Sequence, residues 1–125
     1  MESERRFERV PCNEMVIVHY NDIFMEARLL NISVNGALVH LNDEMSLKID
    51  DKCLITICLS VLDNSLHFLA EVRHSQKNEV GVKFLFLDSD TKIYLNSLLA
   101  FRTANPRRIS EEFDYSSYLP GEGDH

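Results

Sequence analysis

Two short polar stretches carry the residue types best suited to binding chemistry. Near the N-terminus stands Arg5-Arg6-Phe7-Glu8-Arg9, and further along stands Asn31-Ile32-Ser33-Val34-Asn35-Gly36. Arg5 and Arg9 are four residues apart, so their guanidinium groups share a face whether the segment is helical or extended. A guanidinium forks two donors onto a phosphate or onto the O6 and N7 edge of guanine, and its plane stacks on a purine. Taken alone, such a run is more often a solvated terminal charge cluster.

The second stretch combines an amide, a hydroxyl and a glycine at a predicted chain reversal. Asn31 and Ser33 are two residues apart, so on an extended backbone their side chains leave on the same face. Asn35-Gly36 is expected to supply the turn, because glycine accepts positive φ freely and asparagine tolerates it. This corner fits a plain hairpin, and it also fits a cradle that holds a small polar ligand against exposed backbone.

Apolar runs rich in β-branched and aromatic residues surround these stretches at nearly regular spacing. They predict six short strands joined by polar turns, which indicates a small antiparallel barrel or sandwich. The expected strands cover residues 15–20, 23–32, 37–41, 53–59, 66–73 and 80–86.

The hydrophobic period becomes helical after the sixth strand. Asp88-Ser89-Asp90 is a good N-cap cluster, and apolar residues then recur at helical spacing until Asn105-Pro106 ends the helix. We expect the apolar face to pack on the barrel and close one mouth. The chain thus divides into a flexible N-terminal arm (1–13), a barrel with its helix (14–104) and an acidic, mobile tail (105–125).

Length and composition exclude several classes of protein. The chain has 125 residues, 45% of them hydrophobic, which is typical of one globular domain and excludes wholesale disorder. No apolar run approaches the roughly 18–20 residues that span a bilayer, and the N-terminus lacks the apolar core of a signal peptide. We therefore expect a cytoplasmic protein without membrane insertion. The net charge of −7 argues against DNA binding, but not against a local cationic site.

Metal and catalytic motifs are missing from the sequence. Three cysteines, an odd number, argue against a disulfide framework, and there is no CxxC, HxxxH or HExxH spacing for a metal. The histidines have no nucleophile or carboxylate at a telling spacing. We expect neither a metal, a cofactor nor an enzyme.

Together the two polar stretches are more specific than either alone. An Arg-x-x-x-Arg arm before a six-stranded barrel, then Asn-x-Ser-x-x-Gly between its second and third strands, resembles the PilZ domain family. The similarity extends to Glu79-Val80-Gly81-Val82-Lys83-Phe84, which looks like the family's last strand, and covers about residues 4–104. The resemblance implies a mainly β fold, a six-stranded antiparallel PilZ-type barrel with a C-terminal α-helix packed on it. It also implies a non-enzymatic receptor for the bacterial second messenger cyclic di-GMP.

The resemblance also implies the ligand-binding residues. They are Arg5, Arg6, Arg9, Asn31, Ser33, Gly36 and His74. The arginines would grip guanine edges and phosphates from the arm, the Asn and Ser would hydrogen-bond the ligand from the barrel, and the corner glycine would let it approach the backbone. His74, with Arg73 next, is the candidate for the flat side chain that the family places before the glycine of its last strand.

Two positions bear on the strength of the match. Asn31 stands where the family has Asp or Asn, so it lies within the pattern. Glu4 occupies the position thought to tune stoichiometry, which leaves open whether one nucleotide or a stacked pair binds.

Three readings of function remain. In the first, cyclic di-GMP orders the arm over the barrel and alters a surface that an unidentified downstream protein reads. In the second, the domain is a nucleotide-independent interaction adaptor, against which the intact motifs count. In the third, a small barrel binds single-stranded nucleic acid, which requires aromatic and basic residues interleaved on a sheet face, and the strands carry few Lys or Arg.

Overall fold

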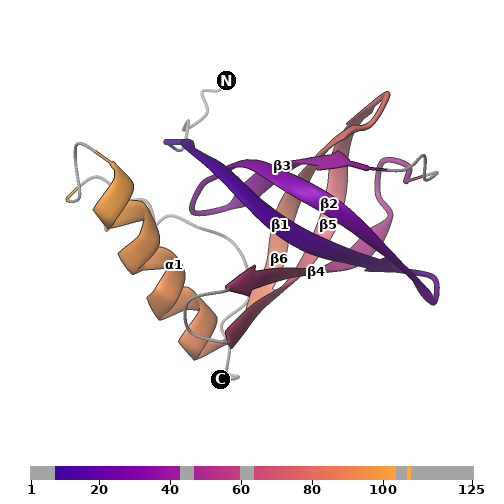
Figure 1. Cartoon of the computed structure of the whole chain (residues 1–125). Helices are drawn as coiled ribbons and strands as arrows, with labels where there is room; N and C mark the ends of the chain where they lie inside the picture. The colour runs from indigo at the N-terminus through magenta and orange to yellow at the C-terminus, as the bar shows by residue number, and fades with distance from the viewer. Residues whose placement is uncertain (1–7, 43–46, 60–63, 104–106, 108–125) are drawn as a thin grey trace.

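Six antiparallel strands close into a barrel, and one helix follows them (Figure 1). The computed structural model describes residues 8–42, 47–59, 64–103 and 107. The elements are β1 (Val10–Tyr20), β2 (Ile23–Ile32), β3 (Gly36–Leu41), β4 (Lys52–Leu59), β5 (Asn64–Gln76), β6 (Glu79–Leu87) and α1 (Ser89–Arg102). The architecture expected from the sequence is confirmed.

The strand order around the barrel is β1-β2-β3-β6-β5-β4. β3 and β6 are therefore hydrogen-bonded neighbours, although β4 and β5 lie between them in the sequence. Gly36 at the start of β3 lies opposite Lys83 of β6, and Gly81 of β6 lies opposite His74 of β5. This order brings the β2–β3 corner next to the last two strands.

Alternation along the strands fills the barrel with apolar side chains. Val16 and Val18 of β1 are buried, whereas Ile17 between them is half-buried on the outer face. Phe68 of β5 and Phe84 of β6 meet in the interior with ring centroids 4.6 Å apart. The resulting core fixes the strand register, because a slip of one residue would turn every apolar side chain outward.

The first strand begins earlier than expected. Residues 10–13, which the sequence placed in the arm, form the start of β1, and Pro11 lies opposite Asn31 of β2. Pro11 is tolerated because β1 pairs with β4 only from Val16 to His19, so no second neighbour needs the missing N–H. A register shift between Pro11 and Glu14 marks the irregular stretch.

The helix begins and ends close to the predicted positions. Asp88 is the N-cap, and its Oδ1 accepts a hydrogen bond from the Thr91 N–H at 2.8 Å. Leu95 and Leu99 are fully buried in the same cluster as the barrel interior, so the helix packs on the barrel. The C-cap is Thr103. Apart from residue 107, the predicted tail lies outside the described residues.

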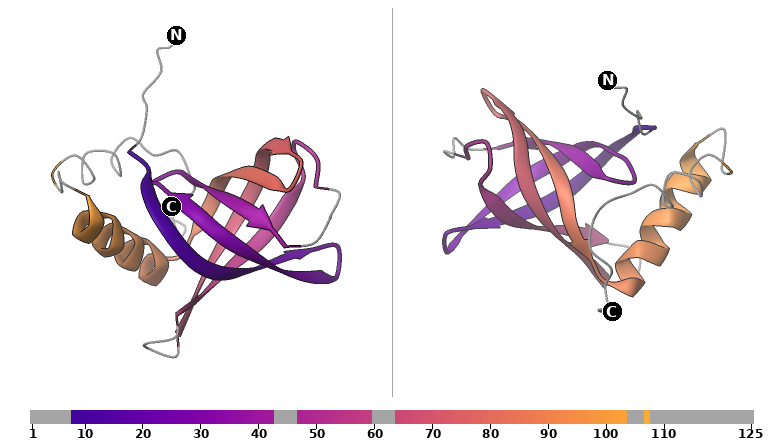
Figure 2. Two further views of the ribbon diagram at one scale, coloured as in Figure 1. Left: turned by 45° about the horizontal axis from the view of Figure 1, so that its top comes forward. Right: turned by 180° about the vertical axis from the view of Figure 1, so that it is seen from behind.

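The helix lies beside one end of the barrel, and the β1–β2 hairpin lies at the other (Figure 2). Asn21 and Asp22 close that hairpin with φ of 53° and 65°, the two positive values that a tight two-residue turn needs. Within the described ranges, no helix is both long and apolar enough to cross a membrane.

Candidate functional site

A polar cavity of about 250 Å³ lies where β3, β6 and β5 adjoin. Its lining comes from four separate parts of the sequence, namely Arg9, Asn35, Gly36, Arg73, His74, Gly81, Val82 and Lys83. Three of these side chains are cationic, and no carboxylate belongs to the lining among the described residues. In a chain of net charge −7, this is a local site suited to an anion.

Arg9 enters the cavity from the arm and is held by the corner. Its Nη1 donates a hydrogen bond to Asn31 Oδ1 at 2.9 Å. Asn31 itself is half-buried and is not among the lining residues. The second arginine of the arm motif and the first residue of the corner motif are therefore brought together, while their contact with a ligand stays a prediction.

The β2–β3 corner is held by the Ser33 side chain. Ser33 is 1% exposed, and its hydroxyl donates to Asn35 Oδ1 (3.0 Å) or to the Gly36 carbonyl oxygen (3.3 Å). The same Oγ accepts from the Asn35 N–H at 3.3 Å, while the Ser33 N–H donates to the Gly36 carbonyl at 2.8 Å. Ser33 thus closes a turn through its own side chain. Direct contact between Ser33 and a ligand stays a prediction.

The expectation that Asn35-Gly36 turns the chain through positive φ is wrong. No described glycine has a positive φ, and Asn35 is not among the residues that do. Gly36 is required for another reason, because a Cβ there would lie 2.3 Å from the Val82 carbonyl oxygen. The close approach of β3 to β6 therefore demands glycine before any ligand is considered. The Asn35 carbonyl, which accepts from the Phe84 N–H at 2.8 Å, ties the corner to β6 as well.

A bulge in β5 presents His74 to the cavity. The register of β5 with β6 shifts between Val72 and His74, and both Arg73 and His74 are exposed as a result. A Cβ on Gly81 would lie 3.2 Å from the His74 Cβ, so the glycine clears the space that the histidine occupies. His74 therefore lines the cavity, and its contact with a ligand stays a prediction.

Two further cations come from the barrel. Lys83 lies opposite Gly36 in the β3–β6 pairing and lines the cavity. Arg73 also lines it, and its Nη1 lies 3.7 Å from Glu71 Oε1. The Arg73 side chain is 55% exposed and that of Glu71 19%, so the pair is a weak surface interaction.

The seven predicted site residues divide into four groups, one of which is Ser33 alone, buried in the corner and not among the lining residues. Arg9, Gly36 and His74 line the cavity, and Asn31 holds Arg9 at its edge. Arg5 and Arg6 lie outside the described residues. Sequence reasoning did not list Asn35, Val82 or Lys83 as site residues, although all three line the cavity. Only the pairing of β3 with β6 brings them together. The sequence did offer one signal for them, the Gly-Val-Lys run at residues 81–83, which was assigned to the last strand and not to the site.

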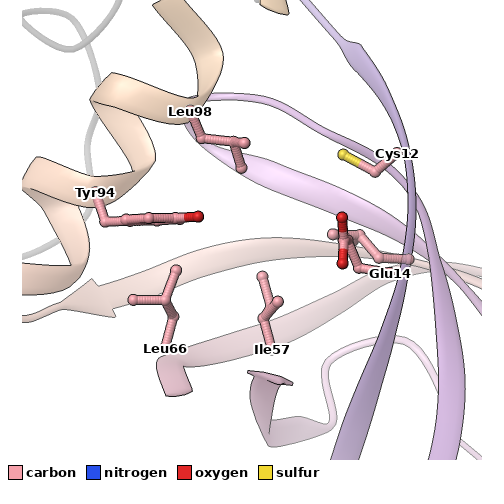
Figure 3. Close-up of a pocket in the computed structure, with 7 residues that line it drawn as sticks. Cys12, Glu14, Ile57, Leu66, Tyr94 and Leu98 are labelled. Atoms are coloured by element: carbon pink, nitrogen blue, oxygen red, sulfur yellow. The ribbon is translucent and has the colours of Figure 1, made fainter. Parts of the chain in front are cut away.

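A second, smaller cavity lies between α1 and the barrel (Figure 3). Tyr94 and Leu98 of α1 point toward Leu66 and Ile57, with Cys12 on β1 on the far side. Its volume of about 50 Å³ is far below that of a nucleotide site, and its lining is mainly apolar. No group of three or more metal-binding side chains occurs in the part of the chain that the structure describes.

Comparison with known proteins identifies a family and several similar folds. The model of the PilZ domain family matches residues 3–101. No curated protein matches the chain. Among solved structures, the PilZ domain of YcgR from Escherichia coli with c-di-GMP is similar, with a TM-score of 0.64 and 16% identity over 88% of this chain and 97% of that one.

Two further structures share the fold. The PilZ domain of CeSA from a cellulose-synthesizing bacterium has a TM-score of 0.59 and 17% identity over 73% of this chain and 93% of that one. The Bacillus subtilis inhibitor of motility, MotI/DgrA, has a TM-score of 0.69 and 20% identity over 83% of this chain. The match spans 53% of the MotI/DgrA chain, about half its length. Identities this low show the likeness of the fold alone.

Proposed function

Since this chain belongs to the PilZ domain family, we propose that it is a receptor for cyclic di-GMP. The observation that carries the proposal is the convergence of Arg9, His74 and Gly36 on one cavity from three separate segments. Cyclic di-GMP offers two phosphates to cations and two guanines to hydrogen-bonding and flat side chains. The cavity supplies partners of both kinds, and the similar YcgR domain was solved with c-di-GMP.

The residues of the arm, of the corner and at His74 each have a task in this proposal. The Arg9 guanidinium binds a phosphate or the O6 and N7 edge of guanine, and Asn31 sets its direction. His74 offers a flat face to a base. Arg5 and Arg6 bind from the arm, and ligand binding orders the arm over the barrel. A downstream protein reads the changed surface, so the chain acts by binding and not by catalysis.

Calorimetric titration of cyclic di-GMP into the full chain tests the proposal. We expect micromolar or tighter binding by the wild type and a loss of about tenfold or more in Arg9→Ala. Arg28→Ala is the matched control, because Arg28 is also exposed but bonds Asn13 and does not line the cavity. Absence of any binding heat with the wild type would refute the proposal.

One observation favours the alternative of a nucleotide-independent adaptor. The Asn31 and Ser33 side chains already have hydrogen-bond partners without a ligand, because Asn31 accepts from Arg9 and Ser33 bonds its own loop. In that case a partner protein would bind the chain equally well with and without cyclic di-GMP. Affinity capture from a cell extract at both conditions, with wild type and Arg9→Ala side by side, distinguishes the two functions.

A further inference from the structure

Two cations on the rigid wall of the cavity have no part in the motifs of the arm and the corner. Arg73 is the extra residue of the β5 bulge, between Val72 and His74, and Lys83 lies on β6 opposite Gly36. Both line the same cavity as Arg9. They differ from Arg9 in origin, because paired strands of the barrel hold them, whereas Arg9 immediately precedes the first strand.

An acid stands beside these two cations without entering the cavity. Glu71 Oε1 lies 3.7 Å from Arg73 Nη1, and Glu71 is the cross-strand partner of Lys83. Cross-strand neighbours have their Cβ atoms about 4.5–5.5 Å apart, so the negative charge of Glu71 acts on both cations. In the free protein, the Glu71 carboxylate therefore already interacts with the two cations and would compete with an incoming anion for them.

We propose that Arg73 and Lys83 form a second phosphate-binding pair, and that Glu71 lowers its affinity for an anion. The inference rests on the proposed function and concerns the phosphodiester groups of the same ligand. Arg9 and the barrel pair line the same cavity, so both are placed to contact one ligand. Because the strand backbone that carries these cations is already ordered, only their side chains lose freedom on binding, and the pair contributes affinity before the arm closes.

The roles of the three residues predict opposite effects of substitution. Lys83→Gln and Arg73→Gln each remove one favourable charge, and we expect the Kd for cyclic di-GMP to rise about three- to tenfold. Glu71→Gln removes the competing charge, and we expect the Kd to fall about two- to threefold. A purely structural role for these residues would not give changes of opposite sign.

Calorimetry with cyclic di-GMP at low and at physiological salt, on the full chain, tests this inference. The salt dependence of Kd should be weaker in Lys83→Gln and Arg73→Gln, since fewer charges are screened. Lys83→Arg should restore binding. Lys92→Gln removes the same charge from α1 and should bind like the wild type. Thermal unfolding checks that every variant is folded.

The outcomes separate the inference from the function on which it rests. If the wild type binds and the Arg73, Lys83 and Glu71 variants bind with unchanged Kd, the barrel pair is refuted and the receptor function stands. If Glu71→Gln weakens binding, the competing role of the acid is refuted. If the wild type does not bind at all, both the function and the barrel pair are refuted.

Discussion

Arg9 Nη1 donates a hydrogen bond to Asn31 Oδ1 over 2.9 Å, between residues 22 positions apart in the sequence. The bond is exposed, so it contributes at most about 1 kcal/mol to folding. Its consequence is positional, because it directs a guanidinium into the cavity before a ligand arrives. Preorganisation of this kind increases affinity by reducing the side-chain entropy lost on binding.

A double-mutant cycle measures the coupling between these two residues. We expect Arg9→Ala and Asn31→Ala each to weaken cyclic di-GMP binding about tenfold, and the double variant to lose less than the product of the two. The reason is that Asn31 acts partly through Arg9. Calorimetry gives the four affinities. Losses that multiply fully would show that the two side chains act independently.

Ser33 gives a prediction on stability. Its buried hydroxyl makes the bonds that close the corner, so Ser33→Ala should lower the free energy of unfolding by about 1–3 kcal/mol. Ligand affinity should fall with it, because Asn35 and Gly36 line the cavity. Urea unfolding measures the first effect, and Ser65→Ala, at an exposed serine of β5, is the control. A Ser33→Ala variant as stable as the wild type would contradict this account of the corner.

The two glycines of the cavity should respond differently to alanine. Gly36→Ala places a Cβ 2.3 Å from the Val82 carbonyl oxygen, so backbone must move and about 1–3 kcal/mol of stability is lost. Gly81→Ala meets the His74 Cβ at 3.2 Å, so β5 has to give by only a few tenths of an ångström, at a cost below about 1 kcal/mol. We expect Gly81→Ala to stay folded and bind cyclic di-GMP more weakly. The reverse ranking of the two stabilities would refute the assignment.

The fold could be predicted from the sequence because its signals are local. Strand alternation, the Asn21-Asp22 turn and the Asp88 cap each depend on neighbouring residues, and all appear in the structure. The start of β1 was missed, because Pro11 normally argues against a strand. Only the absence of a β4 partner before Val16 makes the proline tolerable, and that pairing is a tertiary fact.

The site could be predicted in part. The types and spacing of Arg9 and Gly36 indicated binding, the resemblance to the family added His74, and the barrel brings all three to one cavity. Their contact with a ligand stays a prediction. Lys83 could not be found in this way, because its relation to Gly36 exists only through the β3–β6 pairing. The requirement for Gly36 was predicted for the wrong reason, since a neighbouring strand and not a positive φ excludes a side chain.

The N-cap of α1 predicts a pH dependence. The Thr91 N–H holds the pKa of Asp88 below its ordinary value, so the carboxylate is favoured in the folded state. The contribution of Asp88 to stability is therefore complete above its unfolded pKa, near 3.8, and is lost as the pH falls through the lower folded value. Asp88→Ala should lose about 1 kcal/mol at pH 7 and less below pH 3. Urea unfolding at both pH values tests this, and Asp90→Ala is the control for a first-turn acid that is not the cap.

The end of the arm contacts the C-terminal end of α1. The Thr103 hydroxyl, at the C-cap of α1, donates a hydrogen bond to a carboxylate oxygen of Glu8. Glu8 directly precedes Arg9, so the end of the arm has two anchors, one on the helix and one on the corner. A ligand that moves Arg9 is therefore expected to affect the end of α1 as well, because Glu8 is the neighbour of Arg9 and its side chain bonds Thr103.

Thr103→Val removes this donor while keeping the shape of the side chain. We expect cyclic di-GMP affinity to fall about two- to fivefold, because the arm loses one of its anchors. Hydrogen exchange should show that the ligand protects the last turn of α1 in the wild type and not in the variant. Thr56→Val, at a hydroxyl that contacts His67 on the outer face of the barrel, is the control. Equal protection of α1 in wild type and Thr103→Val would show that ligand binding is not transmitted through Glu8.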